Sequence, residues 1–352
     1  MTGVNRNAVA VLVGLEVRQR IRSTRWKVTA GLLFALTSVL VLGSLYLTVA
    51  VAGESYRDWA SNLLDITLAV VLFLGFAAAP TLSATSINGD RRDATLALVQ
   101  AAPISSWDLA LGKLLGSWFA SLALIGVALP YLIWGAVSSH TSILFAILAM
   151  IVTAAIMGAY CAIGLAFSSL TSRPAASAML TQATVLLLLL GSPIAFGLTY
   201  PMTQQNHRVT VAGWDFDDAT SEANCRLDER EERFNHTEYT WWLLAPNPVL
   251  IVSDVVSAGI DRPDDSPFVG GAGFFAFLQS AARAGPDVRS EGCDALTTPG
   301  LSGDDERLAR HVGDSWYIGL AVTVVIGCAS LAVAARRLRV PAHKLGRGVR
   351  VA

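Results

Sequence analysis

Long apolar runs are the feature that most limits what this chain can fold into. A helix needs about 20 mostly apolar residues to cross a hydrocarbon core about 30 Å thick. The 352 residues are 53% hydrophobic and only 15% charged, which is too apolar for a soluble domain of this size. We predict an all-α integral membrane protein with six transmembrane helices. Five of them cover about 28–52, 63–87, 114–137, 177–200 and 315–335, and the fourth follows a short turn at 138–141 and ends near 167.

The segment 1–27, before the first apolar run, is strongly basic. It contains six Lys or Arg residues and a single acid, Glu16. Apolar residues recur there at helical spacing, which is typical of an amphipathic helix on a membrane surface. An arm that binds nucleic acid is the alternative for such a basic run, but direct fusion to a membrane span disfavours it. We predict an N-terminal interfacial helix on the cytoplasmic side and no nucleic-acid partner.

Between the fifth and sixth apolar runs, in 201–314, the composition changes. This segment holds 20 of the 27 Asp and Glu residues and no Lys. Its stretch 239–258 is apolar enough to suggest a seventh span, but it contains Pro246, Pro248 and Asp254. Prolines interrupt a helix, and a charge at the centre of a span costs roughly 2.5–3.5 kcal/mol. We predict that 239–258 packs on the outer membrane face with Trp241 and Trp242 at the interface.

The distribution of Lys and Arg predicts the orientation. The segments 1–27, 88–113, 168–176 and 336–352 contain 16 of the 26 Lys and Arg residues, including all three Lys. Six spans place these four segments on one side of the membrane, and the side richer in Lys and Arg is normally the cytoplasm. Both termini, including the tail 336–352, are therefore expected in the cytoplasm of a multi-pass plasma-membrane protein. The segment 201–314 becomes a large extracytoplasmic insert between helices five and six.

A short charged island at 88–113 separates the second and third apolar runs. We predict a short helix over 91–101, ended by Pro103, because proline lacks an N–H group. Ser105 and Asp108 then have the spacing of a capping box that opens the next helix. An ordinary polar loop is one interpretation of the island, and a preformed surface that docks on a partner protein is the other.

The island contains the run Thr95-Leu96, Leu98, Pro103-Ile104-Ser105 and Leu111-Gly112-Lys113. This run resembles the coupling segment of ABC-2-type transporter permeases, which lies between their second and third membrane helices. Ala94 and Ala97 stand where that pattern usually has Gly and Glu. The resemblance implies a permease subunit that pairs with a second copy or paralogue, sits among membrane lipids and couples to separate ATPase subunits, usually for export. The residues that it assigns to ATPase coupling are Thr95, Leu96, Leu98, Pro103, Ile104, Ser105, Gly112 and Lys113.

The sequence contains no recognisable catalytic constellation. Gly112-Lys113 lacks the remainder of a P-loop, so ATP and Mg²⁺ are expected in the partner subunit and no cofactor in this chain. Neither a His-Glu-x-x-His motif nor a nucleophile elbow occurs, so we predict no catalytic residues. His207, His236 and His311 in the insert are compatible with a metal site, but solvated loop histidines are the preferred interpretation, and no metal is predicted.

Five further side chains have alternative roles. Cys225 and Cys293 both lie in the insert, where disulfides persist, so we predict a bridge over two reduced thiols. Asp65 lies near the outer boundary of the second span, and this position favours a capping or interfacial role over a role in transport. Thr181 and Gln182 either face a central path or bond between helices. A receptor or assembly factor whose insert binds a ligand remains the alternative to a transporter.

Overall fold

The computed structural model describes residues 5–94, 96, 104–216, 223–260, 268, 270–288 and 307–339. Six helical segments of this part of the chain are long and apolar enough to cross a membrane, in agreement with the predicted number. They are Trp26–Val51, Leu63–Arg92, Ser106–Ser138, Ile143–Leu170, Pro174–Thr203 and Trp316–Arg337.

Several of these segments consist of successive helices. The first contains most of α2 (Thr24–Leu45) and a π-helical turn (Tyr46–Val51); the second contains α4 (Leu63–Ala84) and α5 (Ser86–Arg92). The third joins α7 (Ser106–Ile125) to α8 (Leu129–Ser138), and the fourth is α9 (Ile143–Leu170). The fifth joins α10 (Pro174–Leu186) to α11 (Ser192–Thr199) through a second π-helical turn (Leu187–Gly191), and the sixth is α16 (Trp316–Arg337). Two shorter helices, α1 (Arg6–Arg22) and α3 (Tyr56–Ser61), flank α2.

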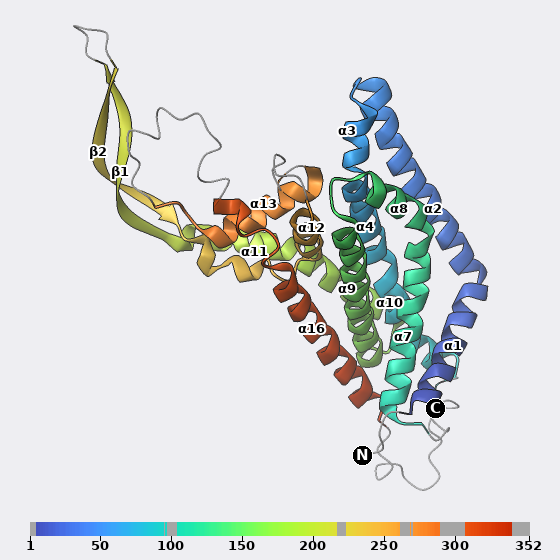
Figure 1. Ribbon diagram of the computed structural model, residues 1–352. Helices are drawn as coiled ribbons and strands as arrows, with labels where there is room; N and C mark the ends of the chain where they lie inside the picture. Colours follow the sequence, from blue (N-terminus) through green and yellow to red (C-terminus); the bar gives the residue numbers. More distant parts are fainter. Residues whose placement is uncertain are drawn as a thin grey trace.

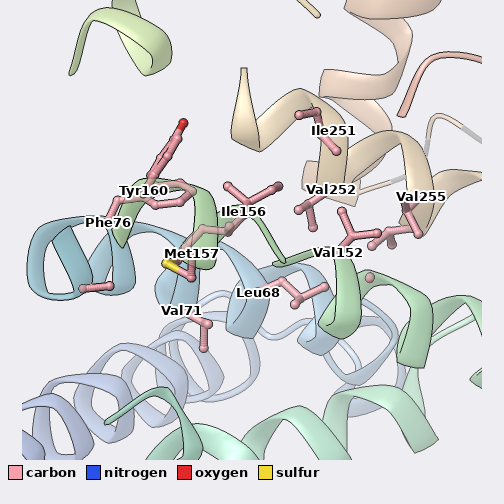
Figure 2. Packing of buried hydrophobic residues seen from close by; sticks show 14 of the residues in the cluster. Leu68, Val71, Phe76, Val152, Ile156, Met157, Tyr160, Ile251, Val252 and Val255 are labelled. Atoms are coloured by element: carbon pink, nitrogen blue, oxygen red, sulfur yellow. The ribbon is translucent and has the colours of Figure 1, made fainter. Parts of the chain in front are cut away.

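Helix α9 lies in the middle of the bundle, between α16 on one side and α4 and α7 on the other (Figure 1). The main core forms where α9 meets α4 and the short helix α12 (Pro248–Ala258), as Figure 2 shows. Tyr160 and Phe76 pack there with ring centroids 5.1 Å apart, and Ile156 and Met157 are fully buried beside them. Helix α9 is thus the central element of the bundle and contacts α4, α7, α10 and α16.

The outer helices expose apolar side chains. On α2, Val28, Leu32 and Val39 are 65%, 66% and 67% exposed. Continuous apolar faces of this kind are characteristic of surfaces that meet lipid or another protein rather than water. The arrangement therefore agrees with a multi-pass membrane protein.

The insert begins with a β-hairpin that the sequence did not indicate. Strand β1 (Gln204–Phe216) pairs antiparallel with β2 (Ala223–Asn235), with Gln204 opposite Asn235. The hairpin extends far from the bundle (Figure 1). Strand prediction depends on apolar residues at every second position, whereas β2 is mostly charged and its cross-strand contacts include the Arg208–Glu231 ion pair. The chain is thus predominantly helical, as predicted, but its insert is not all-α.

The stretch 239–258 is not a seventh span. Its only α-helix is α12, whose 11 residues cover only about 16 Å at 1.5 Å per residue. Most of α12 is buried, in contact with α9, α16 and α13 (Gly270–Ala284), so this helix is enclosed by protein rather than laid on the membrane face as predicted. Trp242, just before it, is 61% exposed, and Phe274 of α13 is 56% exposed.

Candidate functional site

Those predicted coupling residues that the structure describes lie at the end of the bundle where α1 begins and α16 ends, which we call the basic end. The predicted capping box is confirmed there: the Ser105 hydroxyl accepts from Asp108 N at 3.1 Å, and Asp108 Oδ2 accepts from Ser105 N at 2.9 Å. Asp108 Oδ1 also accepts from the backbone N–H of Asn5 at 2.8 Å. One buried carboxylate therefore fixes the starts of both α7 and α1.

Lys113 lies in a buried group of charges and is only 3% exposed. Its ammonium donates to Glu16 Oε1 on α1 at 2.8 Å and lies 2.5 Å from Asp90 Oδ2 on α5. It also donates to the carbonyl of Ser86 at 3.5 Å. Lys113 thus joins three helices, α1, α5 and α7, from inside the protein.

Arg20 completes this group. Its guanidinium donates to Glu16 Oε2, to the Leu82 carbonyl at 2.8 Å and to Ser117 Oγ at 3.2 Å. We refer to Glu16, Arg20, Asp90 and Lys113 as the basic-end charge cluster. Burial raises the pKa of Glu16, but the adjacent Lys113 and Arg20 outweigh it and bring the pKa below the ordinary value of 4.5. Two cations and two anions compensate one another, as buried charges require.

Helices α1 and α7 approach each other closely at Gly112 and Gly116. A Cβ atom at Gly112 would lie 2.6 Å from Leu12 Cβ, and one at Gly116 would lie 2.5 Å from Glu16 Cβ. Any larger residue would push the helices apart and separate Glu16 from Lys113. Gly112 and Lys113, two of the predicted coupling residues, therefore lie in a helix–helix contact rather than on the surface.

Leu96 and Ile104 also face the interior. Leu96 is 7% exposed, and Ile104 packs against the same apolar group, which we call the basic-end apolar cluster. Its buried members are Ile87, Leu96, Leu109, Ala110, Leu165, Ala334, Ala335 and Leu338. Helices α5, α7, α9 and α16 meet in this cluster. The other predicted coupling residues, Thr95, Leu98 and Pro103, lie outside the described residues.

The sequence did not predict the contact that Ser168 makes with α5. Its hydroxyl accepts from the backbone N–H groups of Ile87 at 3.0 Å and Asn88 at 3.1 Å. These groups are in the first turn of α5, where backbone donors have no partner within the helix. Ser168, near the end of α9, thus fixes α5 to α9. A serine at the end of a span gives no sequence signal for such a contact.

The acids at the opposite end, where the β-hairpin is attached (the hairpin end), cap helices. Asp65 Oδ2 on α4 accepts from the N–H of Ala272 in the first turn of α13 at 3.0 Å, which agrees with the predicted capping role. Asp254, used above only as evidence against a span, accepts from the N–H groups of Gly313, Ser315 and Trp316 at 2.8–3.0 Å. Asp254 belongs to α12, so its carboxylate connects this helix to the start of α16.

The remaining candidates of the sequence are placed as follows. Gln182 donates to the Ala77 carbonyl at 3.4 Å, so it bonds between helices. His207 and His236 meet with their Nε2 atoms 2.8 Å apart, and Glu238 Oε1 lies 2.6 Å from His236 Nδ1. The described residues contain no group of three or more metal-ligating side chains arranged around one point.

The predicted disulfide is not tested by the structure. Cys225 lies in β2 opposite Trp214, and Cys293 lies outside the described residues, so the disulfide stays a prediction.

Comparison with known proteins gives one clear result. The family described as "ABC-2 family transporter protein" matches residues 10–241, which is about two thirds of the chain. The match includes the basic-end charge cluster and the β-hairpin and stops before α12. No match was found among curated proteins.

Proposed function

The chain belongs to the ABC-2 transporter family, and from this premise we propose that it is a permease subunit that exports its substrate with energy from a separate ATPase subunit. ATP and Mg²⁺ would bind to that partner, and a second permease copy or paralogue would supply the other half of the path through the lipid bilayer. Both termini and the basic end would face the cytoplasm of a plasma-membrane protein. A non-transporting receptor or assembly factor is the second candidate, favoured only by the size of the insert.

The observation that carries the proposal is the connection between the 88–113 segment and the spans. Lys113 and Asp90 tie the two sides of this segment to each other and to α1, while Leu96 and Ile104 pack against α9 and α16. A displacement of the segment would therefore move α1, α5 and α7 together. This is the connection that a coupling segment needs if closure of an ATPase dimer is to rearrange the spans.

The exposed part of this segment is where an ATPase would bind. Arg92 has a side chain that is 71% exposed and pairs with Asp93, which is 60% exposed. By contrast, Ile104 and Lys113 stabilise the permease itself. We therefore assign direct contact to the residues around Arg92, and an indirect, positioning role to Gly112 and Lys113. Direct contact of Leu98 and Pro103 is proposed from the family resemblance alone, because both lie outside the described residues.

The test is purification of the tagged chain from the membranes of its own cell, followed by identification of co-purifying ATPases and measurement of ATP hydrolysis. Arg92→Glu and Leu98→Asp should reduce association at least tenfold at equal membrane abundance, because each places an unfavourable charge at the docking surface. Arg57→Glu is the matched control, since Arg57 is also exposed but lies at the hairpin end.

Three results would contradict the proposal: no ATPase in the purified complex, wild-type association of both basic-end variants, or an equal loss in the Arg57→Glu control. A chain that purifies alone but binds a ligand through its insert would instead support the receptor.

A further inference from the structure

A cavity at the hairpin end has the properties of a ligand site. It lies between α4, α12 and α13 and has a volume of about 370 Å³. Ligand pockets in proteins are typically about 300–1,000 Å³ and mostly apolar. The walls of this cavity include Leu72 and Phe76 of α4, Val252 of α12 and Phe275 of α13. Phe76 and Val252 also belong to the main core, in which Figure 2 shows them.

Polar groups are few and gathered in two places. Asn62 and Asp65 belong to the beginning of α4, and Ser253 belongs to α12; all other lining residues are apolar or glycine. Asp65 also borders a second, smaller cavity of about 30 Å³, which it shares with His140 and Ser257. The carboxylate is thus at one end of the apolar cavity, on the side of the hairpin end.

The carboxylate is only partly satisfied by the protein. Asp65 Oδ2 accepts from Ala272 N, and none of the ion pairs or other hydrogen bonds formed among the described residues involves Asp65. An acid beside hydrocarbon is costly unless a cation or further donors reach it. A ligand with an ammonium group would supply both.

The cavity is accessible from the surface of the protein. Phe73, one of its lining residues, is 70% exposed, and Ala69 on the same helix is exposed as well. A molecule dissolved in the bilayer could enter between α4 and α13 without crossing a polar surface. The entry route therefore selects for apolar ligands, and Asp65 selects among them by charge.

We propose that this cavity binds a cationic amphiphile, with its ammonium group at Asp65 and its apolar chain between α4 and α12. The site consists only of residues of this chain, and the inference does not depend on the proposed coupling to an ATPase. Anionic and neutral amphiphiles of the same length are the alternatives that the experiment separates.

The test uses the full chain in neutral phosphatidylcholine nanodiscs and a photoreactive dodecylamine with a diazirine in its chain. Labelled peptides are mapped by mass spectrometry, and unlabelled dodecylamine, dodecanol and dodecyl sulfate compete at equal concentrations. We expect saturable labelling of α4 and α12, and at least tenfold stronger competition by the amine than by the alcohol or the sulfate.

Two variants identify the site. Asp65→Asn should keep labelling by chain burial but make the amine and the alcohol compete equally, since the amide can still accept from Ala272 N. Ala69→Phe should fill the cavity and remove labelling, and its exposed position leaves the core unaltered. Asp58→Asn, an exposed acid just before α4, is the control that should behave as the wild type.

Labelling that does not saturate, that maps elsewhere, or that the alcohol or sulfate suppresses as well as the amine would overturn the proposal. An unchanged preference for the amine in Asp65→Asn would do so too. Thermal unfolding of each variant identifies any that is misfolded; should Ala69→Phe unfold early, the Asp65→Asn comparison decides alone.

Discussion

The ammonium of Lys113 lies 2.8 Å from Oε1 of Glu16, which is 97 positions earlier in the chain. This contact joins the helix before the first span to the helix that begins the third. Only 4% and 14% of the two side chains are exposed, so water compensates little for the loss of either charge. Glu16, Arg20, Asp90 and Lys113 can therefore be buried at the basic end because their charges compensate one another.

Lys113→Met should destabilise the protein by about 3–5 kcal/mol, the usual cost of removing one partner from a buried ion pair. Glu16 and Asp90 would then lie next to each other without their shared cation. Thermal unfolding of the purified chain in detergent measures the change. In the double variant Glu16→Leu/Lys113→Met, the loss of unfolding free energy should be clearly smaller than the sum of the losses in the two single variants. If the two losses simply add, the two side chains are not coupled.

The same cluster predicts a pH dependence. The pKa of Glu16 is lower in the folded chain than its ordinary value of 4.5. Its contribution to stability is therefore fully present above about pH 4.5 and is lost as the pH falls through the folded-state pKa. The difference in unfolding temperature between the wild type and Glu16→Gln should shrink when the pH is lowered from 7 to 3. A difference that stays constant or grows would show that the charge of Glu16 is not stabilising.

The number of spans could be predicted from the sequence because an apolar run of about 20 residues normally forms a transmembrane helix. The capping box could be predicted as well, since Ser105 and Asp108 are local partners. The contacts of Lys113 and Ser168 could not, because their partners lie on other helices and depend on how the bundle packs. The interior positions of Leu96 and Ile104 were missed for the same reason: a motif gives the residues of a segment but not the direction in which they face.

The role of Asp254 is a second example of a non-local contact. Its carboxylate accepts three backbone N–H bonds and the Ser315 hydroxyl at 2.8 Å, and it is 1% exposed. Asp254→Asn turns an acceptor into a donor facing other donors, so it should cost at least about 2 kcal/mol. Hydrogen exchange should then accelerate at the amides of Ser315 and Trp316. Asp58→Asn, an exposed acid, is the control; equal protection in both variants would show that Asp254 does not hold α16.

A disulfide between Cys225 and Cys293 remains a prediction from the sequence. Closing a loop of this length would stabilise the insert by about 4 kcal/mol in the chain-entropy model. Mass mapping without reduction should recover the two cysteines in one linked pair of peptides. If both cysteines are fully alkylated in the native, unreduced protein, the bridge does not exist.

The orientation of the chain can be tested with single cysteines at two exposed positions at opposite ends of the bundle. Glu229 lies in β2 and Arg92 at the end of α5. After replacement of the four native cysteines, a membrane-impermeant maleimide should label Glu229→Cys in intact cells. Arg92→Cys should react only after permeabilisation, because the side richer in Lys and Arg normally faces the cytoplasm.

Glu229 lies outside the spans and Arg92 is the exposed last residue of the second one, so neither change should impair insertion. Equal abundance in the membrane fraction controls for it. A cysteine in the basic tail, at Gly346, should behave like the one at position 92, because an even number of spans places both segments on one side. Labelling of both 92 and 346, without labelling of 229, in intact cells would reverse the orientation, and labelling of only one of 92 and 346 would contradict an even number of spans between them. Labelling of position 92 together with position 229 would overturn the six-span topology itself, because an odd number of crossings separates these two positions.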